Sequence, residues 1–140
     1  MFELHPQLEK DTVTVGYFPL SQLLISKDAN YPWFILVPQR KDLTEIHHMT
    51  EADRHQLLKE SCLLSEAIVG AFAPDKMNVA ALGNMVPQLH LHHIARLHDD
   101  PAWPAPVWGA VAAIEYAPEE LQRRIKAVVE LLQGDDFRAA

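Results

Sequence analysis

One short stretch, QLHLHHIAR (88–96), alternates a glutamine and two histidines with leucines, and a third histidine follows directly. In a β-strand, successive side chains point to opposite faces. A strand here would therefore place Gln88, His90 and His92 on one face. The two leucines and His93 would share the other face, which we expect to pack against the core. The polar row would then face a pocket or solvent.

Phosphoryl chemistry is one use for such a row. A neutral imidazole can attack phosphorus and form a covalent intermediate, which divides one difficult displacement into two easier steps. The attacking nitrogen must be unprotonated, and a hydrogen bond from the other ring nitrogen fixes that tautomer. Further donors must hold the phosphate oxygens. His90 suits the role of nucleophile, because Gln88 and His92 flank it on the same face.

Two other interpretations of the row stay open. Polar residues that alternate with leucine are typical of a half-solvated antiparallel strand. Alternatively, His90 and His92 could chelate a metal ion, helped by His98 or the two aspartates after it. The metal interpretation lacks a clear third and fourth ligand at motif spacing.

The elements that must position these residues follow from the hydrophobic pattern. Five segments rich in β-branched, aromatic or apolar residues predict strands: 12–18, 20–26, 33–37, 77–82 and 88–96. Helical periodicity predicts two main helices, one capped by Thr50 and one that begins at Pro118. A shorter helical lead-in is expected over residues 2–10. Short connections favour antiparallel pairing, so the sequence predicts an α+β domain with its helices on one face of an antiparallel sheet of about five strands.

Other side chains have simple expected places. On the first main helix, one apolar face is predicted for Leu57, Leu58, Cys62, Leu64, Ala67, Ile68 and Phe72. Cys62 would then be a small buried hydrophobe. Trp33 lies in an apolar strand and is expected in the core. Trp103 and Trp108 lie in a proline-rich loop, where they could form a lid, a dimer contact or a stacking surface for a base.

Bulk properties narrow the class of protein. The 140-residue chain has 12 basic and 19 acidic residues, a net charge of -7. This charge argues against general nucleic-acid binding. The single cysteine, the absence of a signal-peptide pattern and the absence of a long apolar run predict a cytoplasmic protein that does not enter a membrane.

The longer stretch GNMVPQLHLHHIAR (83–96) resembles the signature of the histidine triad (HIT) family. That signature is His-φ-His-φ-His-φ-φ, where φ is apolar, usually preceded by Gly-Gln-x-Val-x. Asn84 replaces the usual glutamine of the lead-in. Gln88 falls on the first triad position, His90 on the second and His92 on the third. Residues 23–40 and the helix after Thr50 also resemble the family's pocket strands and long helix, so the resemblance covers about 12–96.

The resemblance implies a single HIT-like domain over 1–140, with its core at about 12–96 and a C-terminal loop and helix at 97–140. HIT proteins hydrolyse or transfer nucleotidyl groups, with substrates that include diadenosine polyphosphates and nucleoside phosphoramidates. The resemblance further implies that His90 is the nucleophile and that His92 contacts phosphate oxygens. Gln88 would keep part of the triad's hydrogen-bond network, because an amide both donates and accepts.

The resemblance also implies the binding residues. Asn84 would be a polar group at the phosphate end, and either Ser26 or Asp28 would contact the ribose. Arg96 could reach a phosphate, or could cap the strand end in solvent. Met85 stands where phosphoramidase members carry a serine, which argues against that chemistry in its usual form.

The expected partner is a small-molecule nucleotide, and a homodimer is expected because HIT proteins commonly form one. No cofactor is required, although a divalent metal ion could accompany the nucleotide. A second hypothesis is a catalytically weak nucleotide-binding or scaffold protein of the same fold, motivated by Gln88, Met85 and His93. The third is the histidine metal-binding protein.

Overall fold

The computed structural model describes residues 1–134 and 136–140, and in them six strands form one antiparallel sheet. The strands are β1 (Thr12–Tyr17), β2 (Ser21–Ser26), β3 (Trp33–Pro38), β4 (Lys76–Ala80), β5 (Leu91–Arg96) and β6 (Arg138–Ala139), in the order β4-β5-β3-β2-β1-β6. The helices are α1 (Pro6–Asp11), α2 (Glu51–Phe72) and α3 (Pro118–Leu132), with a 3₁₀ turn η1 (Ile46–His48). The predicted α+β architecture is confirmed.

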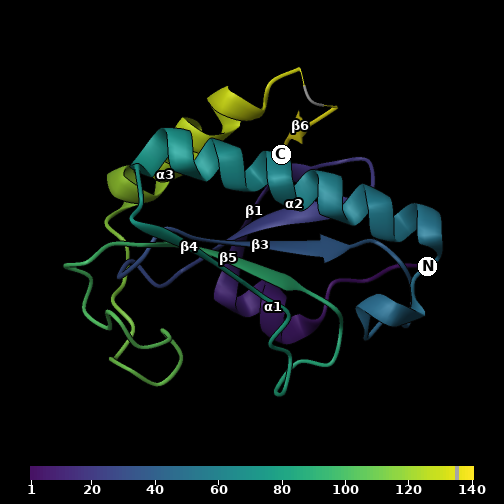
Figure 1. Cartoon of the computed structure of the whole chain (residues 1–140), viewed down its shortest axis with the longest axis horizontal. Coiled ribbons are helices and arrows are strands. Elements are labelled where there is room, and N and C mark those ends of the chain that lie inside the picture. Colours follow the sequence, from purple (N-terminus) through teal and green to yellow (C-terminus); the bar gives the residue numbers. More distant parts are fainter. Residues whose placement is uncertain (135) are drawn as a thin grey trace.

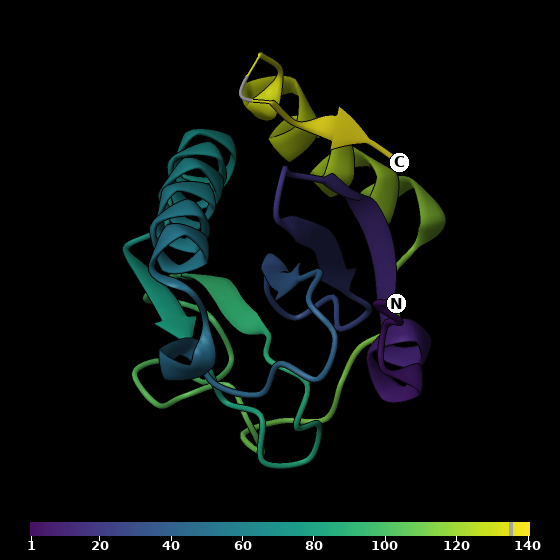
Figure 2. The ribbon, with the colours of Figure 1, turned by 90° about the vertical axis from the view of Figure 1, so that its right-hand side faces the viewer.

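The sixth strand is the C-terminal tail, which the sequence did not predict. Its residues pair with Gly16 and Tyr17 at the end of β1 (Figure 2). A Cβ at Gly16 would collide with the Phe137 ring and with the Arg138 carbonyl. Glycine is therefore what lets the tail approach β1 this closely.

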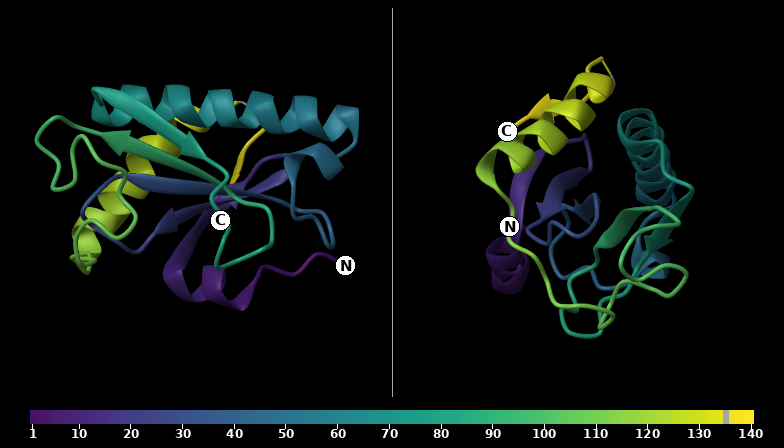
Figure 3. Two further views of the ribbon diagram at one scale, coloured as in Figure 1. Left: turned by 60° about the horizontal axis from the view of Figure 1, so that its bottom comes forward. Right: turned by 90° about the vertical axis from the view of Figure 1, so that its left-hand side faces the viewer.

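Helices cover the two faces of the sheet unequally. The long helices α2 and α3 pack on one face, whereas the short α1 lies on the other, so the expectation that all helices share a face is wrong for α1 (Figure 1). Thr50 caps α2 as expected, since its hydroxyl accepts a hydrogen bond from Asp53 N at 3.1 Å. The segment 97–117 runs along the side of α1 before it reaches α3 (Figure 3).

Both faces of β2 and β3 are buried, which explains their continuous apolar sequences. The larger core lies under α2 and α3 and includes Leu23, Phe34, Leu36, Leu64, Ile68 and Val128. The smaller one lies on the side of α1 and consists of Leu8, Leu24, Ile35, Val37 and Val86. The sheet face on which α1 lies is therefore only partly covered by a helix, and this leaves room for a pocket on that face.

The buried face of α2 differs from the predicted one. Leu58 is 64% exposed and Cys62 is also exposed, whereas Glu60 and Ser61 are buried. The reason is a long-range contact: the Ser61 hydroxyl lies 2.7 Å from Nε2 of His93, on the core face of β5. Polar Ser61 therefore faces the sheet.

The histidine segment is also shorter as a strand than predicted. β5 begins at Leu91, so Gln88 and His90 lie before it, and β4 ends at Ala80. The pairing of β5 with β3 ends at Leu91 and Leu36, although β3 continues to Pro38 beside β2. Residues 81–90 consequently leave the sheet and form one wall of a pocket. Within the described residues, no helix is both long and apolar enough to cross a membrane.

Candidate functional site

A pocket of about 1180 Å³ opens on the α1 side of the sheet. Its walls come from α1, the end of β2, β3, residues 82–86 and the segment 97–117. The pocket brings together five of the seven predicted site residues: Ser26, Asp28, Asn84, His90 and His92. The other two, Gln88 and Arg96, do not line it.

His90 has one committed and one free ring nitrogen. Its Nδ1 lies 2.7 Å from the carbonyl oxygen of Gln88, and a carbonyl can only accept, so Nδ1 carries the proton. Nε2 has no hydrogen-bond partner among the described residues and keeps its lone pair. Burial lowers the pKa of His90 from its usual value, although the bond to Gln88 acts in the opposite direction and a charge on His5 lowers it further. His90 is therefore a neutral imidazole with an unprotonated nitrogen in the pocket.

Gly83 holds the wall against this ring. A Cβ at Gly83 would lie 2.7 Å from the carbonyl oxygen of Val86 and 3.4 Å from Cε1 of His90. Since backbone cannot yield as a flexible side chain can, glycine is required for the wall to lie this close to His90.

His92 uses both ring nitrogens inside the protein. The Trp33 indole N–H donates to Nδ1 at 3.0 Å, so Nε2 carries the proton and donates to the carbonyl oxygen of Leu82 at 3.0 Å. Burial, followed by repulsion from a charge on His90, lowers the pKa of His92 to about 4. His92 is held neutral, and a hydrogen bond to phosphate would have to replace one of these two bonds.

Two tryptophans enclose His92. Trp33 was expected in the core, yet it is only partly buried and forms a pocket wall together with Trp108 from the segment 97–117. The Trp108 ring centroid is 5.0 Å from that of His92, in an edge-to-face arrangement. Alternation along β3 places Trp33 and Ile35 on one face, and Ile35 pairs with His92. The strand register could in principle have predicted that Trp33 lines the pocket beside His92. The sequence, however, did not show which face of the sheet bears the pocket.

The other end of the pocket is polar. Asp28 Oδ1 accepts hydrogen bonds from Asn30 N at 3.0 Å, Asn30 Nδ2 at 2.8 Å and Ile114 N at 3.2 Å. Oδ2 has no such bond in the part of the chain described, and Ser26 Oγ accepts from Asp28 N at 3.2 Å. Asp28 thus fixes the wall at Ile114 and presents one free carboxylate oxygen.

Basic side chains also line the pocket, and the sequence did not identify them. Lys10 and Lys27 come from α1 and from the turn after β2. Lys27 Nζ donates to the carbonyl oxygen of Lys10 at 2.8 Å. Three carboxylates, of Asp11, Asp28 and Glu115, line the same pocket, so the two cations lie among acidic groups.

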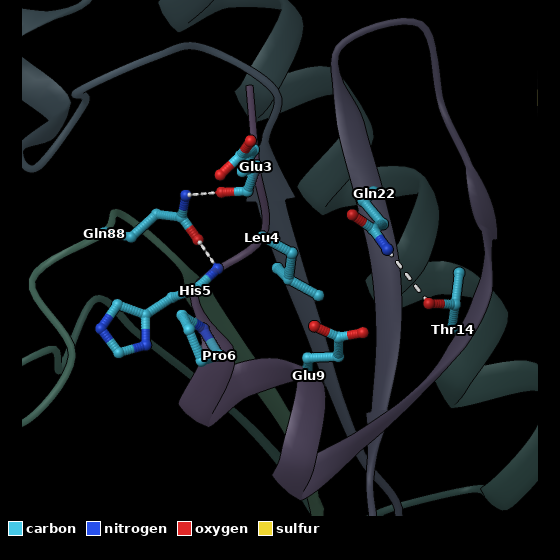
Figure 4. Close-up of a pocket in the computed structure, with 8 residues that line it drawn as sticks. All are labelled: Glu3, Leu4, His5, Pro6, Glu9, Thr14, Gln22 and Gln88. Carbon is cyan, nitrogen blue, oxygen red and sulfur yellow. Dashed lines mark hydrogen bonds between the residues drawn. The ribbon is translucent and has the colours of Figure 1, made fainter. Parts of the chain in front are cut away.

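Gln88 points away from this pocket, which corrects the expectation that it shares a face with His90. Its Oε1 accepts from His5 N at 2.9 Å, and its Nε2 donates to the carbonyl oxygen of Glu3 at 2.8 Å (Figure 4). It lines a second pocket of about 660 Å³ instead. The cause is the early end of the ladder, because residues 88–90 do not follow strand alternation. In the described structure, the hydrogen bond that joins Gln88 to His90 is accepted by the backbone carbonyl of Gln88.

Arg96 is buried at 1% exposure, within the fold. Its guanidinium donates to Asp100 Oδ2 at 2.7 Å, to Asn78 Oδ1 at 2.8 Å and to the carbonyl oxygen of Ala105 at 2.8 Å. These bonds tie the start of the segment 97–117 to the sheet. They correct the expectations that Arg96 reaches a phosphate or lies in solvent.

The candidate metal ligands are not gathered. Among the described residues, no group of three or more His, Cys, Asp or Glu side chains is placed to hold one metal ion. His98, the suggested partner of His90 and His92, lies on the surface with Nδ1 3.7 Å from Asp75 Oδ2.

Comparisons with known proteins identify a family and several similar structures. A family model described as the HIT domain matches residues 7–99. The structure of a histidine triad protein from Bradyrhizobium japonicum is 46% identical and has a TM-score of 0.91, over 92% of this chain and 96% of that chain. A histidine triad protein from Marinobacter aquaeolei VT8 is also 46% identical, with a TM-score of 0.91 over 95% of this chain and 97% of that chain. A hypothetical histidine triad nucleotide-binding protein from Sulfolobus tokodaii shares the fold at 18% identity, with a TM-score of 0.63 over 84% of each chain. No curated protein matches the chain significantly.

Proposed function

This chain belongs to the HIT domain family, and from that premise we propose that it is a nucleotide-binding hydrolase or nucleotidyl transferase. Its substrate is a dinucleoside polyphosphate or a related nucleotide, and the reaction passes through a covalent nucleotidyl-His90 intermediate. The family and the HIT-like fold predicted from the sequence are both confirmed.

One observation carries the proposal: the tautomer of His90. Its Nδ1–H is committed to the carbonyl of Gln88, so the lone pair remains on Nε2 in a buried position that lines the pocket. Burial keeps the ring neutral at pH 7 because it lowers the pKa. A nucleophilic nitrogen needs these features.

In the first step, the Nε2 lone pair of His90 forms a bond to the α-phosphorus. The bond from phosphorus to the leaving group breaks, and the leaving group departs with the bonding electrons and takes a proton from solvent. In the second step, water attacks phosphorus, the N–P bond breaks, and its electron pair returns to Nε2 while the water's proton is released. An acceptor other than water would give transfer in place of hydrolysis. The two steps as written require no cofactor, and a divalent ion could enter with the nucleotide.

The rest of the pocket supports a nucleotide as ligand. The free Oδ2 of Asp28, with Ser26 beside it, suits a ribose hydroxyl. The apolar side chains of Leu8, Ile35 and Val86 line the same cavity and suit a base. Asn84 lies in the wall next to Gly83 and offers an amide to a phosphate.

A turnover assay tests the proposal. Wild type and His90→Ala are incubated with diadenosine polyphosphates, an adenosine phosphoramidate and a nucleotide sugar, and products are separated by chromatography. His55→Ala is the matched control, since this histidine is on the exposed side of α2. Turnover that survives in the control and disappears in His90→Ala is the expected result. Full turnover by folded His90→Ala would refute the covalent mechanism.

The second candidate is a protein that binds nucleotides without turning them over. The observation that favours it is Gln88, whose side chain contributes nothing to the pocket that holds His90. Calorimetric titration with AMP separates the two candidates: a folded wild type that binds AMP but processes no substrate of the panel supports binding alone.

We propose a homodimer in the cytoplasm. The edge strand β4 has unpaired backbone on one side, and its Val79 is 49% exposed. On α2, Leu58 and Val69 are exposed as well. Exposed edges and apolar side chains of this kind are typical of surfaces that a partner covers. Light scattering after size exclusion tests the dimer, and a monomer in dilute solution would refute it.

A further inference from the structure

The side chain of Gln88 bonds the N-terminal segment as a neighbouring strand would. It accepts from His5 N at 2.9 Å and donates to the carbonyl oxygen of Glu3 at 2.8 Å (Figure 4). In an extended chain these two backbone groups point to the same side, and a primary amide offers a donor and an acceptor together. The amide therefore fixes residues 3–5 beside position 88.

His5, held in this way, has a free ring N–H. Its Nδ1 accepts from Gln7 N at 3.1 Å and so caps α1. A backbone N–H can only donate, so Nδ1 keeps its lone pair and Nε2 of the neutral ring carries the proton. That N–H has no acceptor among the described residues. In Figure 4 the ring extends away from Gln22 and Thr14, on the side of Gln88.

Gln88 brings His5 and His90 together. The side-chain oxygen of Gln88 bonds the backbone of His5, and its carbonyl oxygen bonds the ring of His90. His5 lines the smaller pocket, and Gln7, two residues later in the chain, lines the larger pocket that contains His90. His5 is also close enough that a positive charge on it would lower the pKa of His90.

We propose that His5 contacts the phosphoryl group that His90 attacks, donating its Nε2–H to one of the phosphoryl oxygens, and that Gln88 is the residue that positions it. This inference rests on the proposed function. The N-terminal segment thereby supplies an imidazole beside a triad position that has none. A fixed neutral donor can stabilise the charge that shifts onto these oxygens in the transition state without adding a cation.

The test separates the proposed contact from simple helix capping. His5→Asn keeps one of the best N-cap acceptors but removes the imidazole, whereas His5→Ala removes both. If His5 only caps α1, His5→Asn will match wild type in kcat/KM and only His5→Ala will lose stability. We expect both variants to lose kcat/KM by about 10²-fold, the effect of removing one fixed donor. We expect His5→Asn to keep the Tm of wild type.

A double-mutant cycle tests the role of Gln88. If Gln88 acts through His5, Gln88→Ala will lower kcat/KM of wild type but will change His5→Asn little further. Equal additional losses in both backgrounds would overturn the positioning role. His55→Asn, with the same substitution on the exposed side of α2, is the control for nonspecific effects.

A binding measurement keeps this inference distinct from the proposed function. If wild type turns over no substrate, the proposed function fails, and AMP binding by calorimetry then decides the fate of His5. AMP affinity that falls about tenfold in His5→Asn supports the contact, since this equals about 1.4 kcal/mol. Unchanged AMP affinity in His5→Asn overturns it, and so does a wild type that does not bind AMP.

Discussion

Acid should destabilise this protein through two buried histidines well before its carboxylates protonate. Burial lowers the pKa values of His92 and His93 to about 4. In the unfolded chain both titrate near 6.5. As the pH falls from 6.5 to 4, the unfolded chain therefore binds protons that the folded chain does not. Stability is fully present above about pH 7 and is lost as the pH falls through this window.

The size of the loss follows from the two pKa values. For one histidine with a pKa of 6.5 unfolded and about 4 folded, the free energy of unfolding falls by about 2 kcal/mol between pH 7 and pH 5. His92 and His93 together give about 4 kcal/mol, and the lowered pKa of His90 acts in the same direction. This is a large part of the 5–15 kcal/mol that is typical of small domains.

Urea titrations at pH 7, 6 and 5 measure this loss. The matched variant is Ser61→Ala/His93→Leu, which replaces both members of a buried pair with apolar groups and leaves no orphaned hydroxyl. We expect the variant to lose about 2 kcal/mol less than wild type between pH 7 and pH 5. His55→Gln, which removes an exposed histidine from the same helix, should behave as wild type. A double variant with the wild-type pH dependence would refute the reasoning.

Three further substitutions test single contacts. Trp33→Phe removes the donor that opposes protonation of Nδ1 of His92, so the pKa of His92 should rise above its value of about 4 in an NMR titration; an unchanged pKa contradicts the contact. Gly83→Ala should move the wall at Val86 and with it the ring of His90, so kcat should fall by about 10²-fold and Tm should fall as well; wild-type kcat would show that the wall is not needed. Arg96→Gln should lower the free energy of unfolding by about 3–5 kcal/mol in urea, because it leaves a buried carboxylate unpaired; a loss below about 1 kcal/mol, as for an exposed pair, contradicts this.

The sequence predicted the strands because their apolar character does not depend on their partners. It misplaced Gln88 because the pairing of β5 with β3 ends at Leu91 and Leu36, and the sequence of one strand does not show where its pairing with another strand ends. The same limit applies to α2, where the buried face depends on the contact between Ser61 and His93. A periodic pattern ranks residues by polarity along one element and contains no information on a polar pair between two elements.

The predictions for the charged residue Arg96 and the aromatic residue Trp33 were wrong for a related reason. Arg96 was compatible with a phosphate contact until its partners in the segment 97–117 were known. Trp33 was assigned to the core because its neighbours are apolar, although its indole N–H needs a partner when buried and finds it in His92. Both side chains satisfy a buried donor through a contact far away in the sequence.

The histidines of the site are the same residue type, but their hydrogen-bond partners give them different tautomers and therefore different chemical roles. At His92 both nitrogens are committed, to Trp33 and to a backbone carbonyl, so this ring has neither a free lone pair nor a free proton. At His90 the Nδ1–H donates to the carbonyl oxygen of Gln88, which leaves a lone pair on Nε2. At His5 a backbone N–H occupies Nδ1 and leaves a proton on Nε2. A nucleophile and a donor of opposite tautomers are thus both hydrogen-bonded to one residue, Gln88. Exchanging Gln88 for histidine would remove the amide that holds His5, so completing the triad signature should lower activity in this protein.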